Sequence, residues 1–221
     1  MPRSSSRPGP VPAMTLTGIA AAAVAIADRD GLTGVTMRSV AAALGTSAAG
    51  LYRYVASREE LVAHMVDLVS ADVRHRRPTG DWVGDLVDVA ESQRGVFRTH
   101  PWLAGALDGA LVLGPNVLDH LEWGLAVLEG VVAPPGQKME ALAVTNGIAA
   151  LFASAGTVGG PEAFAQLDAR RHARVLAVLG AATSGSPTPD LFPRVLEAVL
   201  RAILSTSPRS GPRDRSGRQD G

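Results

Sequence analysis

Small, hydroxyl-bearing and basic side chains crowd into residues 46 to 54, and this combination is suited to reading DNA. Ala48, Ala49 and Gly50 carry no hydrogen-bonding group, so they are expected to approach thymine methyl groups closely. Hydrogen bonds to base edges or phosphates must come from polar neighbours, because hydroxyl and guanidinium groups can donate to both. Those neighbours are Thr46, Ser47, Tyr52, Arg53 and Tyr54.

Two short helices are predicted to position these side chains. Thr36 can cap a helix over 36–44, Gly45 permits a tight turn, and Ser47 can cap a second helix over 47–54. An amphipathic helix precedes the pair, and a longer helix with a capping box follows it. This order is that of a helix-turn-helix, whose second helix fits the major groove of DNA.

Three stretches of this region carry a family pattern. They are GVTMRSVA at 34–41, LYRYV at 51–55 and SREEL at 57–61, of which the last two together are the most specific. With these motifs, residues 15–68 resemble the N-terminal domain of the Tet repressor family of bacterial transcription regulators. The resemblance implies a DNA-binding head.

The resemblance also assigns roles to side chains. Arg38 matches a family position that can reach a guanine edge, whereas Thr36, Tyr52, Tyr54 and Arg58 match positions that hold phosphates. Arg58 would stand in the first turn of its helix, where a cation is poorly placed for the helix dipole, so a phosphate explains it better than solvation. For the two tyrosines the alternative is that one packs in the small core.

A second family pattern lies in residues 82–132, through HPWLA at 100–104 and PNVLDHLE at 115–122. It resembles the C-terminal domain shared by the Tet repressor subgroup. The family implies an all-helical homodimer in which the last two long helices of each subunit pair across the two-fold axis as a four-helix bundle. Such a protein is expected to bind a palindromic double-stranded DNA operator and to be released by a small-molecule effector, most simply as a repressor.

The periodicity of apolar residues predicts an all-α fold without strands, in two domains. The predicted helices cover about 15–30, 36–44, 47–54, 57–75, 82–99, 115–132, 137–157, 162–182 and, from a start at 187–189, the chain to 205. The predicted segments are a disordered arm over 1–14, a helix-turn-helix domain over 15–77, a helical effector-binding and dimerisation domain over 78–205, and a disordered tail over 206–221.

Polar or aromatic residues on otherwise apolar helix faces are candidates for binding the effector. Each has another reading, since the aromatic ones can be core, His100 and Asn116 can cap helices, and His120 can be solvated. Asn146 is the strongest candidate, because an amide among alanines and valines in mid-helix needs a partner. The full set is His100, Trp102, Asn116, His120, Trp123, Asn146 and Phe152.

Charge and composition narrow the class of protein. The formal net charge is zero, but residues 1–77 hold nine basic and six acidic side chains, whereas 78–207 hold eight and thirteen and 208–221 hold four and two. A basic first part is compatible with DNA binding. The chain has no cysteine, which excludes disulfides and thiolate metal sites and fits a cytoplasmic protein.

Enzyme signatures are missing from the sequence. It contains no His-Glu-x-x-His pair, no Gly-x-Ser-x-Gly elbow and no phosphate-binding glycine loop, so we expect no catalysis, cofactor or metal ion. Two alternatives remain open. One is a helical ligand-binding or scaffold protein without DNA function, and the other is an uncharacterised helical enzyme.

The first thirty residues allow two further interpretations. Arg3 and Arg7 in the arm either belong to a leader without function or reach a minor groove or phosphate. Arginines before the apolar run 16–27 also suggest a secretory signal, but Ile19 and Ile26 lie on a helical stripe that the next helices need for their core. No other run is long and apolar enough to span a membrane.

Overall fold

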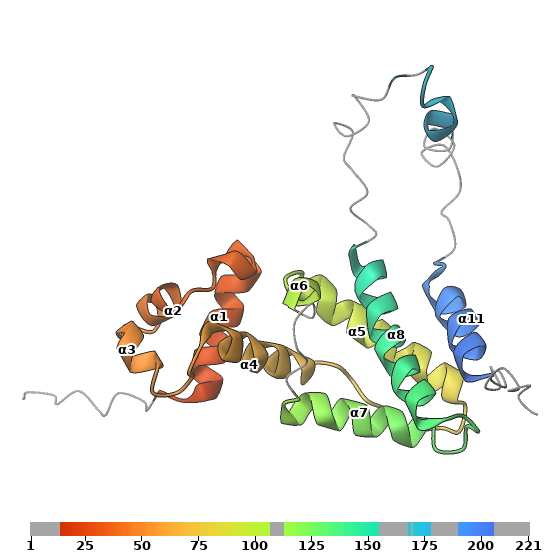
Figure 1. The fold of residues 1–221 in the computed structure, drawn as a ribbon, viewed down its shortest axis with the longest axis horizontal. Coiled ribbons are helices and arrows are strands. Elements are labelled where there is room, and N and C mark those ends of the chain that lie inside the picture. The colour runs from red at the N-terminus through yellow and green to blue at the C-terminus, as the bar shows by residue number, and fades with distance from the viewer. Residues whose placement is uncertain (1–13, 107–112, 155–167, 169, 178–189, 206–221) are drawn as a thin grey trace, which may run out of the picture.

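The structure is a computed structural model, and it describes residues 14–106, 113–154, 168, 170–177 and 190–205. Within these ranges the regular secondary structure is helical without strands, which confirms the predicted all-α fold (Figure 1). The predicted arm up to residue 13, the tail over 206–221 and most of the predicted helix over 162–182 lie outside the described residues. Of that helix, residues 173–177 are described and helical.

The first helices gather at one end of the molecule, drawn red to orange in Figure 1, and we call residues 14–70 the head. Its N-caps follow the sequence, since Thr15, Thr36, Ser47 and Ser57 each accept a backbone N–H with the side-chain oxygen. Gly45 has φ 64°, a conformation that favours glycine, so the predicted turn is confirmed. The elements are α1 (Leu16–Asp30), the 3-10 helix η1 (Leu32–Gly34), α2 (Met37–Ala43), α3 (Ala48–Leu51) and α4 (Arg58–Ser70).

A small apolar core holds the head together. Ile19 of α1, Val40 of α2, Leu51 of α3 and Leu61 and Met65 of α4 are all fully buried in it. Removing one such side chain leaves a cavity and costs about 2–5 kcal/mol of stability. These shared contacts hold α2 and α3 against α1 and α4.

The remaining helices form a second bundle, which we call the body. α5 packs against α8, and α11 packs against both of them, while α4 of the head touches α6 and α7. Figure 1 shows α8 and α11 side by side at the end away from the head. The elements are α5 (Trp82–Thr99), α6 (Leu103–Ala106), α7 (Pro115–Val127), α8 (Pro135–Ser154) and α11 (Phe192–Leu204).

A buried arginine fixes the start of α11 on α5. Arg94 donates to both carboxylate oxygens of Asp190, at 3.2 and 2.8 Å, and its guanidinium lies 4.5 Å from the centre of the Phe192 ring. The hydrogen bond to Arg94 holds the pKa of Asp190 below its usual range. Asp190 also accepts the Phe192 N–H at 3.0 Å, as a capping residue would, and Pro193 lies in the first turn as predicted.

Three predicted helices end earlier in the structure than in the prediction. α3 stops at Leu51 instead of residue 54, because the Tyr54 and Val55 amides both turn back to the Leu51 carbonyl. α4 stops at Ser70 instead of residue 75, since the Arg74 amide donates to Ser92 Oγ of α5. α7 stops at Val127 instead of residue 132, because the chain after Val127 continues in turns.

Candidate nucleic-acid interface and ligand cavity

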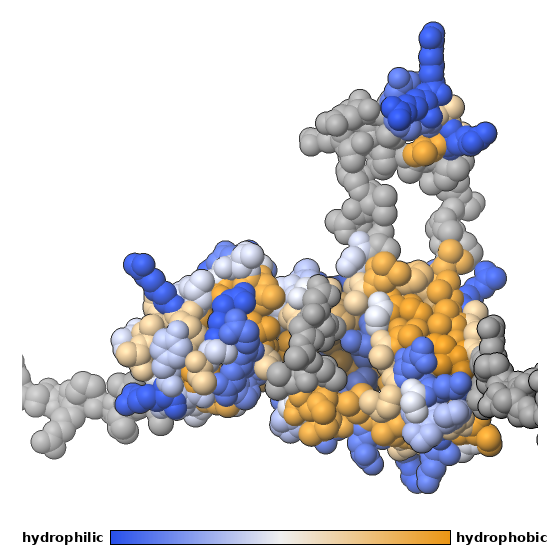
Figure 2. All heavy atoms as spheres, in the orientation of Figure 1, coloured by the Kyte–Doolittle hydropathy of each residue, from blue (hydrophilic) through white to orange (hydrophobic). Residues whose placement is uncertain are grey.

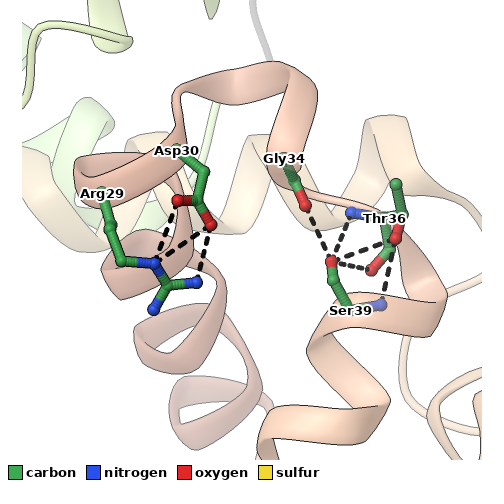
Figure 3. A network of polar contacts seen from close by, with 5 residues as sticks. All are labelled: Arg29, Asp30, Gly34, Thr36 and Ser39. Carbon is green, nitrogen blue, oxygen red and sulfur yellow. Dashed lines mark hydrogen bonds and ion pairs between the residues drawn. The ribbon is translucent and has the colours of Figure 1, made fainter.

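A reciprocal cap at the start of α2 orients the first part of the candidate DNA surface. Thr36 Oγ1 accepts the Ser39 N–H at 3.0 Å, and Ser39 Oγ accepts the Thr36 N–H at 2.9 Å. Ser39 Oγ also donates to the Gly34 carbonyl at 2.8 Å (Figure 3). The Thr36 hydroxyl therefore has a structural task, and a phosphate contact by this residue stays a prediction.

α3 presents a surface of small groups. Ala49 is exposed, and Ala48 and Gly50 are partly exposed. Ser47 Oγ accepts the Gly50 N–H at 3.1 Å, and a Cβ on Gly50 would lie 2.8 Å from Thr46 Oγ1. Glycine at this position therefore leaves room for the Thr46 hydroxyl against α3.

The longer side chains predicted to reach DNA lie on α2 and directly after α3. Arg38 on α2 and Arg53 after α3 are exposed. Tyr52 is 54% exposed and Tyr54 is 38% exposed, so neither ring fills the core of the head. The alternative that one of them packs inside is wrong, because Leu51 and Val55 on either side fill that space.

The Arg58 side chain was expected to bind a phosphate or, failing that, to be solvated, but in the structure it binds the protein backbone. Its Nε donates to the Val35 carbonyl and its Nη2 to the Leu32 carbonyl, both at 2.7 Å. These bonds tie the start of α4 to the loop before α2. Because two of its nitrogens are occupied, Arg58 stabilises the head, and its predicted phosphate contact can use only the donors that remain.

The body contains a cavity of about 270 Å³ between α5, α7 and α8. Its walls are mostly apolar, from residues such as Val96, Phe97 and Leu142. Two of the predicted effector residues, His120 and Asn146, lie in its wall, and the structure adds two polar residues, Ser70 and Gln93.

The other predicted effector residues have different surroundings. Phe152 packs edge-on against Phe192, with ring centres 5.4 Å apart. Trp123 donates through Nε1 to the Arg76 carbonyl at 2.6 Å. A larger cleft of about 560 Å³, which includes Trp123 and His100, is lined by charged side chains of α5 and of the segment between α4 and α5.

The remaining predicted effector residues contact two aspartates of the head. Asp28 Oδ1 accepts from Trp102 Nε1 and lies against His100 Nδ1, both at 2.7 Å. Asp67, which is buried, accepts from Asn116 Nδ2 at 3.0 Å and from the Val117 N–H at 3.1 Å. His100, Trp102 and Asn116 therefore join the head to the body and do not line the 270 Å³ cavity.

Gln93 lies at the centre of a chain of polar groups at the cavity. Its Nε2 lies 3.1 Å from Asn146 Oδ1 and 3.1 Å from His120 Nε2, and His120 Nδ1 lies 2.7 Å from His75 Nε2. Burial, with the nearby His75 adding to it, lowers the pKa of His120 to about 4, so its imidazole is neutral at pH 7. The sequence carried a signal for Gln93, a polar residue on the buried stripe of its helix.

In the part of the chain that the structure describes, no three His, Asp or Glu side chains are placed to hold a metal ion. Nor does any described helix have the length and hydropathy to cross a membrane.

Comparison with known sequences identifies both parts of the molecule. Residues 19–65 match the family model "Bacterial regulatory proteins, tetR family". Residues 76–170 match the model "Tetracyclin repressor-like, C-terminal domain". The chain belongs to the TetR family. The helix-turn-helix of the head lies inside the first match, and the wall of the cavity lies largely inside the second.

Among relatives of this TetR-family chain is the HTH-type transcriptional repressor DrrR1 of Streptomyces coeruleorubidus, which is 36% identical over 141 residues, 63% of this chain and 52% of the relative. An HTH-type transcriptional regulator of Saccharopolyspora erythraea is 32% identical over 128 residues, 58% of this chain and 53% of the relative. The chain thus spans about half the length of these relatives. The crystal structure of Streptomyces coelicolor ActR in complex with actinorhodin is similar with a TM-score of 0.69 and 25% identity, over 87% of this chain and 97% of that one.

Proposed function

We propose that this protein is a ligand-responsive transcriptional regulator that binds a palindromic DNA operator as a homodimer and is released by a small molecule, most simply as a repressor. The observation that carries the proposal is the set of contacts that Asp28 and the buried Asp67 make with His100, Trp102, Asn116 and Val117, which join a helix-turn-helix head to a cavity-bearing body. Two similar proteins support it, since DrrR1 is named a transcriptional repressor and ActR was crystallised with actinorhodin.

We further propose residues 15–77 as the DNA-binding domain and 78–205 as the effector-binding and dimerisation domain. A single helix-turn-helix reads few base pairs, so specific binding needs two heads about 34–36 Å apart. Apolar residues gather over α8 and α11 (Figure 2), where Leu151 is 65% exposed and Val195 is 37% exposed. This face, here called the α8–α11 face, is the proposed dimer interface.

An effector would act through α7. Val117, His120 and Leu121 of this helix line the cavity, while Asp67 of α4 holds its first turn. A Cβ on Gly114 would overlap the Asp67 carboxyl, so the fit at this junction is tight. A ligand that moves α7 therefore moves α4 and the head, and it changes DNA affinity only as far as it prefers one spacing of the two heads.

The proposal places the protein in the cytoplasm, where DNA is accessible, and gives it no catalytic role. Both points follow from the proposed binding function.

Footprinting on the DNA beside its own gene tests the proposal. We expect two protected patches related by two-fold symmetry, lost in Arg53→Glu because the charge reversal repels phosphate at the DNA surface. Arg98→Glu makes the same charge change on an exposed position of α5 and should leave the footprint intact. Equal loss in both variants, or no protection by the unaltered protein, would contradict the proposal.

A further inference from the structure

One acceptor in the cavity wall has no partner within the described chain. Gln93 is 3% exposed, and its Oε1 is buried without a hydrogen bond to any described residue. Buried polar atoms are nearly always paired, because an unpaired acceptor loses its water and gains nothing in return. Gln93 belongs to the cavity wall, so a molecule in the cavity is the natural source of the missing donor.

In the structure, none of the neighbouring polar groups donates to Gln93 Oε1. Both hydrogens of Gln93 Nε2 are used, one toward Asn146 Oδ1 and one toward His120 Nε2. Because His120 Nε2 accepts, the single proton of the neutral ring sits on Nδ1 and points to His75 Nε2. The Ser70 hydroxyl is also engaged, since it donates to the Val66 carbonyl at 2.8 Å.

Asn146 offers the complementary group beside this acceptor. Its Oδ1 is occupied by Gln93, whereas its Nδ2 donates to no described residue. The cavity thus presents an amide acceptor and an amide donor next to each other. A hydroxyl group can satisfy both, since it donates one hydrogen and accepts another.

The rest of the wall argues for an uncharged ligand. None of the described lining residues is Asp, Glu, Lys or Arg, and the remaining walls are apolar side chains of α5 to α8 and Val73. An ion placed here would lose its hydration without gaining a partner of opposite charge. The larger cleft differs in this respect, because charged residues including Arg76 and Asp88 line it and pair with each other at 3.0 Å.

From these observations we infer that the cavity binds a small, uncharged, mainly apolar molecule that carries one hydroxyl group, which donates to Gln93 Oε1 and accepts from Asn146 Nδ2. Only the further step, that this molecule is the effector, rests on the proposed function. The volume of about 270 Å³ lies near the lower end for small-molecule sites, so one or two rings, roughly, fit the space.

Three probes with the same ring system test the inference on the full chain at pH 7.5 by titration calorimetry. They are 1-naphthol, its methyl ether 1-methoxynaphthalene, and 1-naphthoate. We expect 1-naphthol to bind about tenfold more tightly than the ether, which lacks the donor, and the charged carboxylate to bind more weakly than either. Equal affinity for naphthol and ether, tightest binding of naphthoate, or no binding of any probe overturns the inference.

A variant of Gln93 tests whether its side chain accepts the hydrogen bond from the hydroxyl group of the ligand. Gln93→Met keeps the length of the side chain without the amide and should remove the preference for naphthol over its ether. Gly95→Ala, at an exposed position on the same helix, should retain that preference. Circular dichroism checks that both variants are folded. If Gln93→Met does not fold, the comparison of probes on the unaltered protein still decides, and a folded Gln93→Met that keeps the preference overturns the assignment.

DNA affinity is measured separately, so that the two proposals fail differently. Naphthol that binds with the expected preference but leaves operator binding unchanged would support the ligand class and count against effector control. Operator binding by a protein that binds naphthol no more tightly than its ether would support the proposed DNA-binding function and overturn the inferred ligand class.

Discussion

At the scale of single residues, Arg38 is the side chain that we propose for sequence readout. It is exposed in the first turn of α2. Arg38→Ala should weaken binding to the preferred operator by about 1–3 kcal/mol and relax selectivity at one base pair. Fluorescence anisotropy across single-base operator variants measures both effects. An equal loss on every variant would show that Arg38 contacts phosphate instead.

Arg58 is expected to act through the fold of the head as well as through charge. Arg58→Ala removes two hydrogen bonds to backbone carbonyls and should lower the free energy of unfolding by about 1–3 kcal/mol, with a loss of DNA affinity that is the same for all sequences. Urea denaturation gives the first quantity and anisotropy the second. Arg53→Ala, at an exposed position, is the matched control and should leave stability unchanged. Unchanged stability in Arg58→Ala would rule out its structural role.

His120 should make stability depend on pH. Its pKa in the folded protein is about 4, below the ordinary value of 6.5, so folding favours the neutral ring. The resulting stability is fully present above pH 6.5 and is lost as the pH falls toward 4, by roughly 3 kcal/mol in total. Urea titrations at pH 7 and pH 4.5 on the unaltered protein and on His120→Gln measure the difference. The variant should lose less stability on acidification, and an identical loss would refute the account.

The sequence indicated which polar residues need a partner, but it did not indicate which partner each of them has. His120 and Asn146 were predicted as polar residues on apolar helix faces, and both lie in the wall of the cavity. Gln93 lies there too and carries the same sequence signal, but it was not among the predicted residues. His100 and Asn116 look alike by that criterion, yet they bind Asp28 and Asp67 of the head. The partners are 72 and 49 residues away, and only the folded chain brings them together.

At the scale of elements, the contact between α4 and α7 should stabilise the molecule measurably. Asp67→Asn keeps the shape but leaves one carbonyl oxygen for two donors, so one of them is unpaired. We expect a loss of about 1–3 kcal/mol in the free energy of unfolding by urea. Asp88→Asn is the matched control, because Asp88 forms only a surface pair with Arg76 and should change stability by less than about 1 kcal/mol. Similar losses in both variants would contradict the special role of Asp67.

Helix starts were predictable, whereas several helix ends were not. Thr36 and Ser47 predicted the starts of α2 and α3, because a capping side chain binds a backbone N–H only three residues further along the chain. The ends depend on tertiary contacts. α4 ends early where the Arg74 amide meets Ser92 of α5, and nothing near Ser70 in the sequence indicates that partner.

At the scale of the whole molecule, the account depends on two heads acting together. The α8–α11 face exposes apolar residues that a monomer would leave in water. If this face pairs two subunits, the two copies of α3 are held at a fixed distance. Symmetry of the protein then becomes symmetry of its DNA site.

Sequencing of the DNA fragments that the purified protein selects from a random double-stranded pool tests this claim most directly. The account predicts enrichment of an inverted repeat whose half-sites are centred about one helical turn apart, roughly 10 base pairs, or a whole multiple of that. Enriched fragments without two-fold symmetry, or no enrichment over the starting pool, would contradict it.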